Sequence, residues 1–273
     1  MEKQQTVIRP AAGFSLNLYE LWKYRELFYF FTWRDIKVKY KQTYLGVAWA
    51  LIQPLALMLL FTFVLARNFP VATGGMPYEI FSLSGLILWN LAYSSISGAS
   101  ESMIQQSNII KKIYFPRLII PCSSLLTALF DFLLAFVVFI VFCFLYGQPV
   151  AVSALYCFPL GILMVLCAAF GLGTFLSALN VQYRDFRYVV PFLLQLLFFG
   201  SQIIYPLGNV GPSWLRYLLA VNPVNGAIEL FRLPLGHSYD PVIVLTGLAS
   251  AFIFTFTGLF YFRKSEAYFA DLA

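Results

Sequence analysis

Long apolar runs separated by short polar segments dominate this chain. A helix needs roughly 20 mainly apolar residues to cross the hydrocarbon core of a bilayer. Six runs approach or exceed that length, at residues 46–66, 80–100, 118–146, 155–179, 188–205 and 241–262. The third run is long enough to require a tilt, and the fifth is at the short limit. The pattern predicts an all-α integral membrane protein with six transmembrane helices.

Amphipathic segments accompany these spans. Residues 15–31 repeat apolar side chains near helical spacing, including Leu18 and Trp22, with charged side chains largely opposite. We expect them to form an interface helix that lies flat on the inner membrane surface. Two further amphipathic pieces, 213–221 and 224–232, are too short to cross a bilayer. They predict a re-entrant pair of short helices between spans five and six.

The expected organisation is one membrane domain with short flanks. Residues 1–32 form a cytoplasmic N-terminal segment that contains the interface helix, residues 33–265 the transmembrane domain, and residues 266–273 a cytoplasmic tail. No signal peptide is expected, because the first 15 residues lack an apolar core.

Composition supports the membrane assignment. The chain is 60% hydrophobic and 11% charged, whereas soluble domains are about 25% charged. An isoelectric point near 9.1 is compatible with nucleic-acid binding, but the positions of the basic residues point to a membrane instead, and we expect no nucleic-acid partner.

Basic residues predict the orientation of the bundle. Fifteen Lys and Arg lie before span one, between spans two and three, between spans four and five, and after span six. Three lie in the alternate segments, namely Arg67, Arg216 and Arg232. The positive-inside rule therefore places both termini in the cytoplasm, which requires an even number of spans.

Two groups of these basic residues border the first three spans and form a predicted basic collar. Its members are Arg34, Lys37, Lys39, Lys41, Lys111, Lys112 and Arg117. Attraction to anionic lipid and simple orientation explain such a collar fully. Contact with an anionic substrate headgroup explains it equally well, and the sequence leaves both open.

Polar residues inside the spans are candidates for a pathway or for helix packing. Asp131 sits mid-span, where an acid is costly unless it faces the bundle interior or water. It predicts either a pore contact or a structural hydrogen bond. Span two carries several serines, which fit close helix packing or a wetted channel wall.

Aromatic and amide side chains share the spans and could line a tunnel in which sugar rings stack. Packing against lipid or other helices is the alternative for each single aromatic residue. The candidate tunnel residues are Trp49, Trp89, Asn90, Tyr93, Asp131, Phe192, Gln195, Phe198, Gln202 and Tyr205.

Catalytic and metal-binding motifs are missing from the sequence. It has no Gly-Lys pair, and therefore no phosphate-binding loop of the GxxxxGK[ST] type. There is also no paired-carboxylate motif, nucleophile elbow or metal-binding cluster. The four cysteines lie inside apolar runs without CxxC spacing, as small buried residues do. We expect a protein that is not an enzyme and binds neither a metal nor a cofactor.

Several motifs resemble one known family. They are WRDIKVKYKQTYLGVAWALIQPL at 33–55, NIIKKIYFPR at 108–117, ALNVQYRDFRYVVPFLLQ at 178–195, and the YP…NP…FR series from Tyr205 to Arg232. In this order they resemble the permease subunits of type-2 ABC exporters. They are most similar to those that export O-antigen, capsular polysaccharide or teichoic acid. The resemblance covers about residues 15–265.

The resemblance implies a homodimer in a bacterial plasma (inner) membrane, with two copies of a separate ATPase that binds ATP and Mg. The substrate would be a lipid-linked glycan, with its pyrophosphate near the basic collar. Residues implied to dock on the ATPase are Leu18, Trp22, Asn108, Ile109 and Tyr114. Residues implied to form an outer gate are Tyr205, Pro206, Trp214, Asn222, Pro223, Glu229 and Arg232.

Three other functions are compatible with parts of the pattern. A type-2 ABC permease for a small hydrophobic drug or haem would share the topology. A membrane-embedded glycosyltransferase or lipid phosphatase would need a carboxylate pair or a His/Arg cluster that the sequence does not show. A proton-coupled carrier would depend on Asp131 alone.

Overall fold

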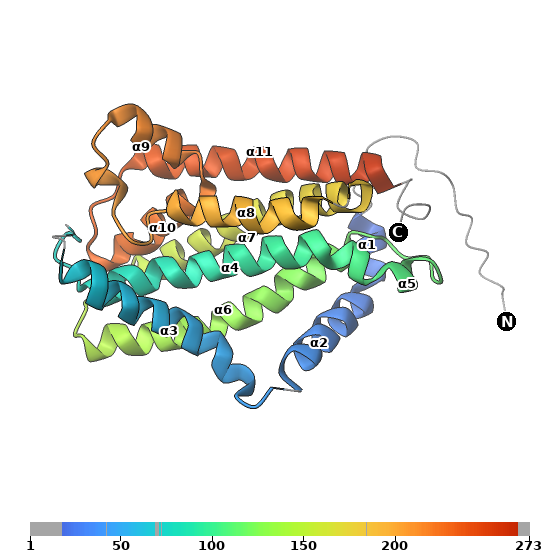
Figure 1. The fold of residues 1–273 in the computed structure, drawn as a ribbon, viewed down its shortest axis with the longest axis horizontal. Coiled ribbons are helices and arrows are strands. Elements are labelled where there is room, and N and C mark those ends of the chain that lie inside the picture. The colour runs from blue at the N-terminus through green and yellow to red at the C-terminus, as the bar shows by residue number, and fades with distance from the viewer. Residues whose placement is uncertain (1–17, 42, 69–70, 72, 184, 267–273) are drawn as a thin grey trace.

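The computed structural model describes residues 18–41, 43–68, 71, 73–183 and 185–266, and the described part is helical without strands (Figure 1). Its α-helices are α1 Leu18–Lys23, α2 Arg25–Lys41, α3 Trp49–Phe61, α4 Tyr78–Gln105, α5 Ser107–Ile110, α6 Ile119–Leu145, α7 Ala154–Gln182, α8 Phe186–Phe199, α9 Ser213–Ala220, α10 Pro223–Arg232 and α11 Pro241–Ser265. Short 3-10 or π-helical stretches are Gly46–Ala48, Thr62–Ala66, Leu207–Asn209 and Leu233–Leu235.

Five segments are long and apolar enough to cross a membrane. They are Gly46–Ala66, which contains α3, and helices α4, α6, α7 and α11. Their ends lie close to those predicted from the sequence for spans one to four and six. The apolar pattern was sufficient because each run is longer than the minimum and ends in a polar or turn segment.

Helix α4 is the most buried of the spans and packs between α6 and α7. Its serines Ser84, Ser100 and Ser102 are buried, and each hydroxyl donates to a carbonyl three residues earlier, over 2.7–2.8 Å. Hydroxyl groups satisfied within their own helix allow a polar sequence to lie in the bundle interior. For these three serines the structure shows helix packing rather than a wetted wall.

Helices α7 and α11 cross at a point that requires two glycines. A Cβ atom on Gly171 would lie 2.2 Å from the carbonyl oxygen of Phe254, and one on Gly258 would lie 2.0 Å from the carbonyl oxygen of Gly171. Close backbone approach between small residues is a main source of helix association in membranes, where apolar burial between helices adds little.

The substitution Gly171→Ala is therefore expected to destabilise the fold although alanine is the better helix former. The added methyl forces α7 and α11 apart, at a cost of about 1–3 kcal/mol, which exceeds a propensity gain of about 1 kcal/mol. The matched control is Gly208→Ala, since a Cβ there meets no atom within 4 Å. Thermal unfolding in detergent measures both variants, and equal midpoints would contradict this account of the crossing.

The fifth predicted span is shorter than expected. We predicted a run from 188 to 205, but α8 ends at Phe199, and its 14 residues extend about 21 Å against a core of about 30 Å. The amide of Asn225 donates to the carbonyl of Gly200 over 2.9 Å, and its Oδ1 accepts from the backbone N–H of Gln202 over 2.7 Å. A side chain distant in sequence thus satisfies the backbone groups at the helix end, and the chain turns back into the protein.

The N-terminal amphipathic segment also differs from the prediction. The expected helix at 15–31 is divided into α1 and α2, and α2 continues to Lys41 across the predicted domain boundary at 32–33. Helix α2 packs on α6 and runs from the α1 end of the molecule toward the start of α3 (Figure 1). The described part of the segment is therefore joined to the bundle along α6.

Candidate functional site

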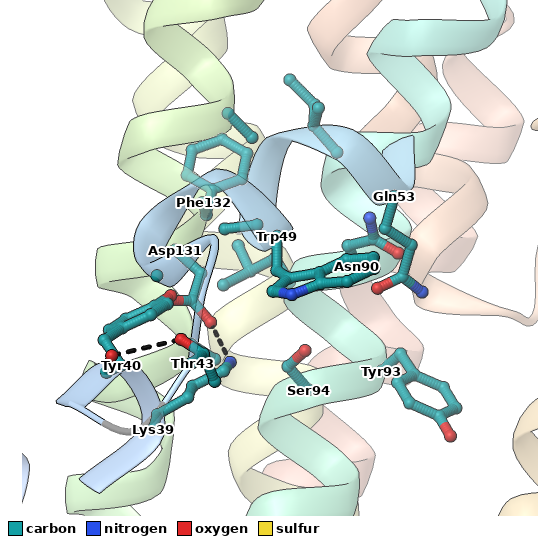
Figure 2. Close-up of a pocket in the computed structure, with 16 residues that line it drawn as sticks. Lys39, Tyr40, Thr43, Trp49, Gln53, Asn90, Tyr93, Ser94, Asp131 and Phe132 are labelled. Carbon is teal, nitrogen blue, oxygen red and sulfur yellow. Dashed lines mark hydrogen bonds and ion pairs between the residues drawn. The ribbon is translucent and has the colours of Figure 1, made fainter. Parts of the chain in front are cut away.

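A cavity of about 300 Å³ lies where α2, α3, α4 and α6 meet. Its lining includes four residues of the predicted tunnel, namely Trp49, Asn90, Tyr93 and Asp131. Trp49 extends into the space between the helices, and Asn90, Ser94 and Tyr93 follow one another along α4 (Figure 2). The structure thus gathers an indole, a phenol, an amide and a hydroxyl around one opening, a combination that suits stacking and hydrogen bonding to a polar ring.

An ion pair on one wall of this cavity was not predicted from the sequence. Asp131 of α6 accepts from the Lys39 ammonium and from the Tyr40 hydroxyl at the end of α2 (Figure 2). Asp131 lies about 18 Å along α6 from Ile119, and its side chain is 14% exposed. Burial and the hydrogen bond to Asp131 raise the pKa of Tyr40, so its hydroxyl remains a donor at physiological pH. Of the two predicted roles for Asp131, the structure shows the contact with a neighbouring helix.

Two further predicted tunnel residues, Trp89 and Phe198, pack against each other. Trp89 is buried, and its ring lies 5.5 Å from that of Phe198 on α8. The Phe198 ring also lies 6.3 Å from that of Phe61 on α3. These three rings, Phe61, Trp89 and Phe198, join α3, α4 and α8.

The remaining predicted tunnel residues lie in two environments. Phe192 and Gln195 are exposed on α8, on the side away from the bundle. Gln202 is fully buried, and its Nε2 donates to the Glu229 carboxylate over 2.8 Å and to the Asn225 carbonyl over 2.7 Å. Tyr205 is half-buried and donates to the Phe199 carbonyl over 2.8 Å. In this conformation Gln202 therefore has no open surface to present to a tunnel.

The predicted basic collar does not converge on one point. Lys39 pairs with Asp131, whereas Arg34 pairs with Asp35 and donates to Gln106 over 3.0 Å. Arg117 contacts the backbone of Glu266 near the end of α11. Besides Lys39, the exposed collar residues are Lys37 and Lys41 on α2 and Lys111 and Lys112 after α5. The role of the collar in binding anionic lipid or an anionic substrate headgroup stays a prediction.

The residues predicted to dock on an ATPase lie on one connected unit. Rings of Phe31 on α2 and Phe115 after α5 lie 5.8 Å apart, and both side chains are buried with Ile110. Ile109 packs against this cluster. Trp22, Asn108 and Tyr114 are exposed on the unit, whereas the Leu18 side chain is outside the described part. The segment that carries Asn108 and Ile109 forms α5, a helix of four residues.

The two short helices predicted at 213–221 and 224–232 are α9 and α10. Trp214 on α9 is 67% exposed. Helix α10 begins at an Asn222-Pro223 cap, in which Asn222 Oδ1 accepts from the backbone N–H of Val224 over 3.1 Å. The rest of α10 is buried between α4, α7 and α11. Of the predicted gate residues, Trp214 alone is exposed, while Pro206, Pro223, Glu229 and Arg232 are buried.

The strongest polar anchor of α10 is Arg232, which has 0% exposure. Its guanidinium lies 3.5 Å from the centre of the Phe81 ring. It donates to the Phe81 carbonyl over 2.7 Å and to the Ser84 hydroxyl over 3.0 Å. A planar guanidinium can stack and donate twice at once, which fixes α10 against the first turns of α4.

Sequence reasoning missed several residues that the structure places at these sites. Gln53 and Thr43 line the cavity beside Trp49 and Asn90. Ser94, one of the serines of span two that could form a wetted channel wall, also lines it. Asn225 is fully buried and bridges the end of α8 to the end of α9. The sequence feature that could have pointed to Asn225 is the Asn222-Pro223 pair, which is typical of a helix start. A buried helix that starts there places Asn225 within its first turn.

Comparison with known proteins gives a consistent result. Residues 26–236 match the model of the family described as "ABC-2 type transporter". A Myxococcus xanthus protein, "O-antigen export system permease protein RfbA", is 29% identical over 260 residues, which cover 90% of this chain and 96% of the relative. A Klebsiella pneumoniae protein of that name is 30% identical over 244 residues, with 88% and 92% covered. The Escherichia coli "Polysialic acid transport protein KpsM" is 26% identical over 247 residues, with 85% and 91% covered.

Proposed function

This chain belongs to the ABC-2 type transporter family, and we propose that it is the membrane permease subunit of an ATP-driven exporter of a polysaccharide. The observation that carries the proposal is the extent of its similarity to permeases for O-antigen and polysialic acid, which spans 85–90% of the chain. The cavity supports it, because a site with a Trp, a Tyr, amides and a hydroxyl suits a sugar better than it suits an apolar drug.

ATP hydrolysis would come from a separate partner. The sequence has no phosphate-binding loop, and α1, the first part of α2 and the loop around α5 pack together at one end of the bundle (Figure 1). A push on this unit would reach α6 through the Lys39–Asp131 pair, as a rigid-body shift. The complete transporter would contain two copies of this chain and two ATPase subunits.

The membrane arrangement would use six spans, with α8 as the fifth. Because α8 is short, the polar turn and α9–α10 after it would lie at the depth of the outer leaflet as a re-entrant pair. The excess of basic residues on the α1 side would place both termini in the cytoplasm of a bacterium, with the chain in the inner membrane.

The substrate would be a lipid-linked glycan that moves along the face formed by α3, α4 and α8. Tyr93 is 40% exposed and Trp49 is 54% exposed, so both rings are available to a passing sugar. The exposed amines of Lys37 and Lys41 would meet the phosphate groups of the carrier lipid at the inner surface.

Alanine at Tyr93 or Trp49 is expected to reduce export several-fold while the protein still assembles, because exposed rings contribute little to the fold. The matched control is Phe252→Ala, which removes a ring that is 66% exposed on α11. Surface polymer and the amount of purified complex are measured for each variant. Equal export by all three would contradict a glycan path past Tyr93 and Trp49.

The function itself is tested by deletion and complementation in the host. Loss of the gene should leave lipid-linked polymer inside the cell, and the wild-type chain should restore it to the surface. Co-purification should recover an ATPase subunit. Unchanged surface polysaccharide with altered sensitivity to drugs or haem would instead assign a small-molecule exporter.

A further inference from the structure

A second cavity, of about 340 Å³, lies at the α9 end of the bundle and is separate from the site at α2. Its walls come from the turn before α4, the segment after α8, helix α9, the end of α10 and the loop before α11. Five separate segments therefore surround one cavity. The glycan path proposed above, along α3, α4 and α8, does not include this cavity. Its volume is within the range of small-molecule sites.

The two carboxylates on the walls of this cavity already have hydrogen-bond partners within the protein. Both oxygens of Glu229 are occupied, one by Gln202 Nε2 over 2.8 Å and the other by the backbone N–H of Asp240 over 3.0 Å. Asp240 pairs with Arg216 and also caps α11 through the backbone N–H of Val242 over 2.9 Å. These contacts hold the polar groups in fixed positions around the cavity.

Three buried atoms of the residues that line this cavity have unused hydrogen-bonding capacity. Gln202 directs both protons of its amide nitrogen to acceptors, which fixes the amide orientation and leaves Oε1 as an acceptor. Within the described residues, Gln202 Oε1, Arg216 Nε and His237 Nδ1 are buried without a hydrogen-bond partner. Buried polar atoms of this kind are costly, and they make the walls of the cavity polar.

The charges around the cavity favour a neutral ligand. Arg216 offsets Asp240, and Arg232 lies one helical turn from Glu229. Burial, together with the charge of Arg232, lowers the pKa of His237, so the imidazole is neutral at pH 7. A phosphate or carboxylate ligand would lie near the carboxylates of Glu229 and Asp240, and the donors that stabilise these carboxylates are already hydrogen-bonded to them. The hydroxyl groups of a neutral ligand can instead both donate and accept.

We propose that this cavity binds a neutral sugar unit of the polymer, with its hydroxyls at the exposed polar side chains of Asn209 and Ser238 and its ring beside Tyr239. The inference rests on the proposed export function and adds a second glycan site at the opposite end of the bundle from the ATPase-docking unit. Tyr239 lines the cavity and is 48% exposed, so its ring can provide an apolar face at the opening.

Two glycines provide a matched test that does not disturb these contacts. Gly208 lines the cavity and Gly211 does not, and a Cβ on either meets no atom within 4 Å. Gly208→Phe should therefore fill the cavity, and Gly211→Phe should add the same side chain outside it. Saturation-transfer NMR would use the full-length chain in lipid nanodiscs with methyl glycosides of glucose, galactose, mannose, rhamnose and N-acetylglucosamine, and with glucose 6-phosphate.

At least one neutral glycoside should give a signal with the wild-type and Gly211→Phe proteins and lose it with Gly208→Phe. Tyr239→Ala should weaken the same signal, which gives a second readout if Gly208→Phe does not fold. Absence of any signal, which would mean water alone in the cavity, overturns the proposal. An equal signal from Gly208→Phe and wild type, or a preference for glucose 6-phosphate, also overturns it. If the wild-type chain restores export but no glycoside binds, the second site fails and the export function stands.

Discussion

Arg232→Leu is expected to cause the largest loss of stability of any single substitution considered for this chain. The change removes two hydrogen bonds and a stacked contact from a side chain with 0% exposure. It also removes the cation nearest along α10 to Glu229, which is itself 4% exposed. Removing one partner from a buried charged cluster costs about 3–5 kcal/mol. Helix α10 would then detach from α4.

Thermal unfolding of the purified protein in detergent measures this effect, with surface polymer as the functional readout. Arg232→Lys should lower the unfolding temperature by an intermediate amount. An ammonium group keeps the charge but cannot stack on Phe81 and donate two hydrogen bonds with the planar geometry of a guanidinium. The matched control is Arg216→Leu, whose side chain is 29% exposed and whose pair should contribute about 1 kcal/mol or less. A wild-type unfolding temperature for Arg232→Leu would show that α10 does not depend on this anchor.

Lys39→Met should destabilise the protein more than Asp131→Asn, although the two residues form one pair. Without Lys39, the Asp131 carboxylate is left partway along a spanning helix with Tyr40 as its donor, at a cost of about 3 kcal/mol. Without the Asp131 charge, the Lys39 side chain, which is 48% exposed, can extend its ammonium toward the membrane surface at a smaller cost.

The double variant Lys39→Met with Asp131→Leu should recover much of the loss, because neither charge is then left unpaired. Unfolding temperatures of the single and double variants give the coupling between the two positions. Additive losses would contradict the ion pair. Export by Asp131→Asn is expected to persist, and its complete loss in a stably folded protein would instead support a proton-carrying role for Asp131.

The spans could be read from the sequence because they depend on local composition. Helices α4, α6, α7 and α11 end within a few residues of the predicted limits, since each is an unbroken apolar run with polar ends. These features require no knowledge of the partner helix.

Three features that the sequence did not reveal depend on contacts between residues far apart in the chain. Asp131 and Lys39 are separated by 92 positions, and their pairing decides both the role of the acid and the shape of the basic collar. The end of α8 depends on Asn225, which is 25 residues beyond Gly200. Gln202 was an attractive tunnel residue for its type, but its burial depends on Glu229 and Asn225 of another helix.

The central claim is that a glycan passes along the α3–α4 face of this chain beside Tyr93. The most direct measurement replaces Tyr93 with the photo-crosslinking residue p-benzoylphenylalanine, and Phe252 in a separate variant, and irradiates cells during export. Covalent attachment of the polymer is expected at position 93, dependent on ATP hydrolysis by the partner, and none is expected at position 252. Polymer attached equally at both positions, or lipid but no glycan attached at position 93, would contradict the claim.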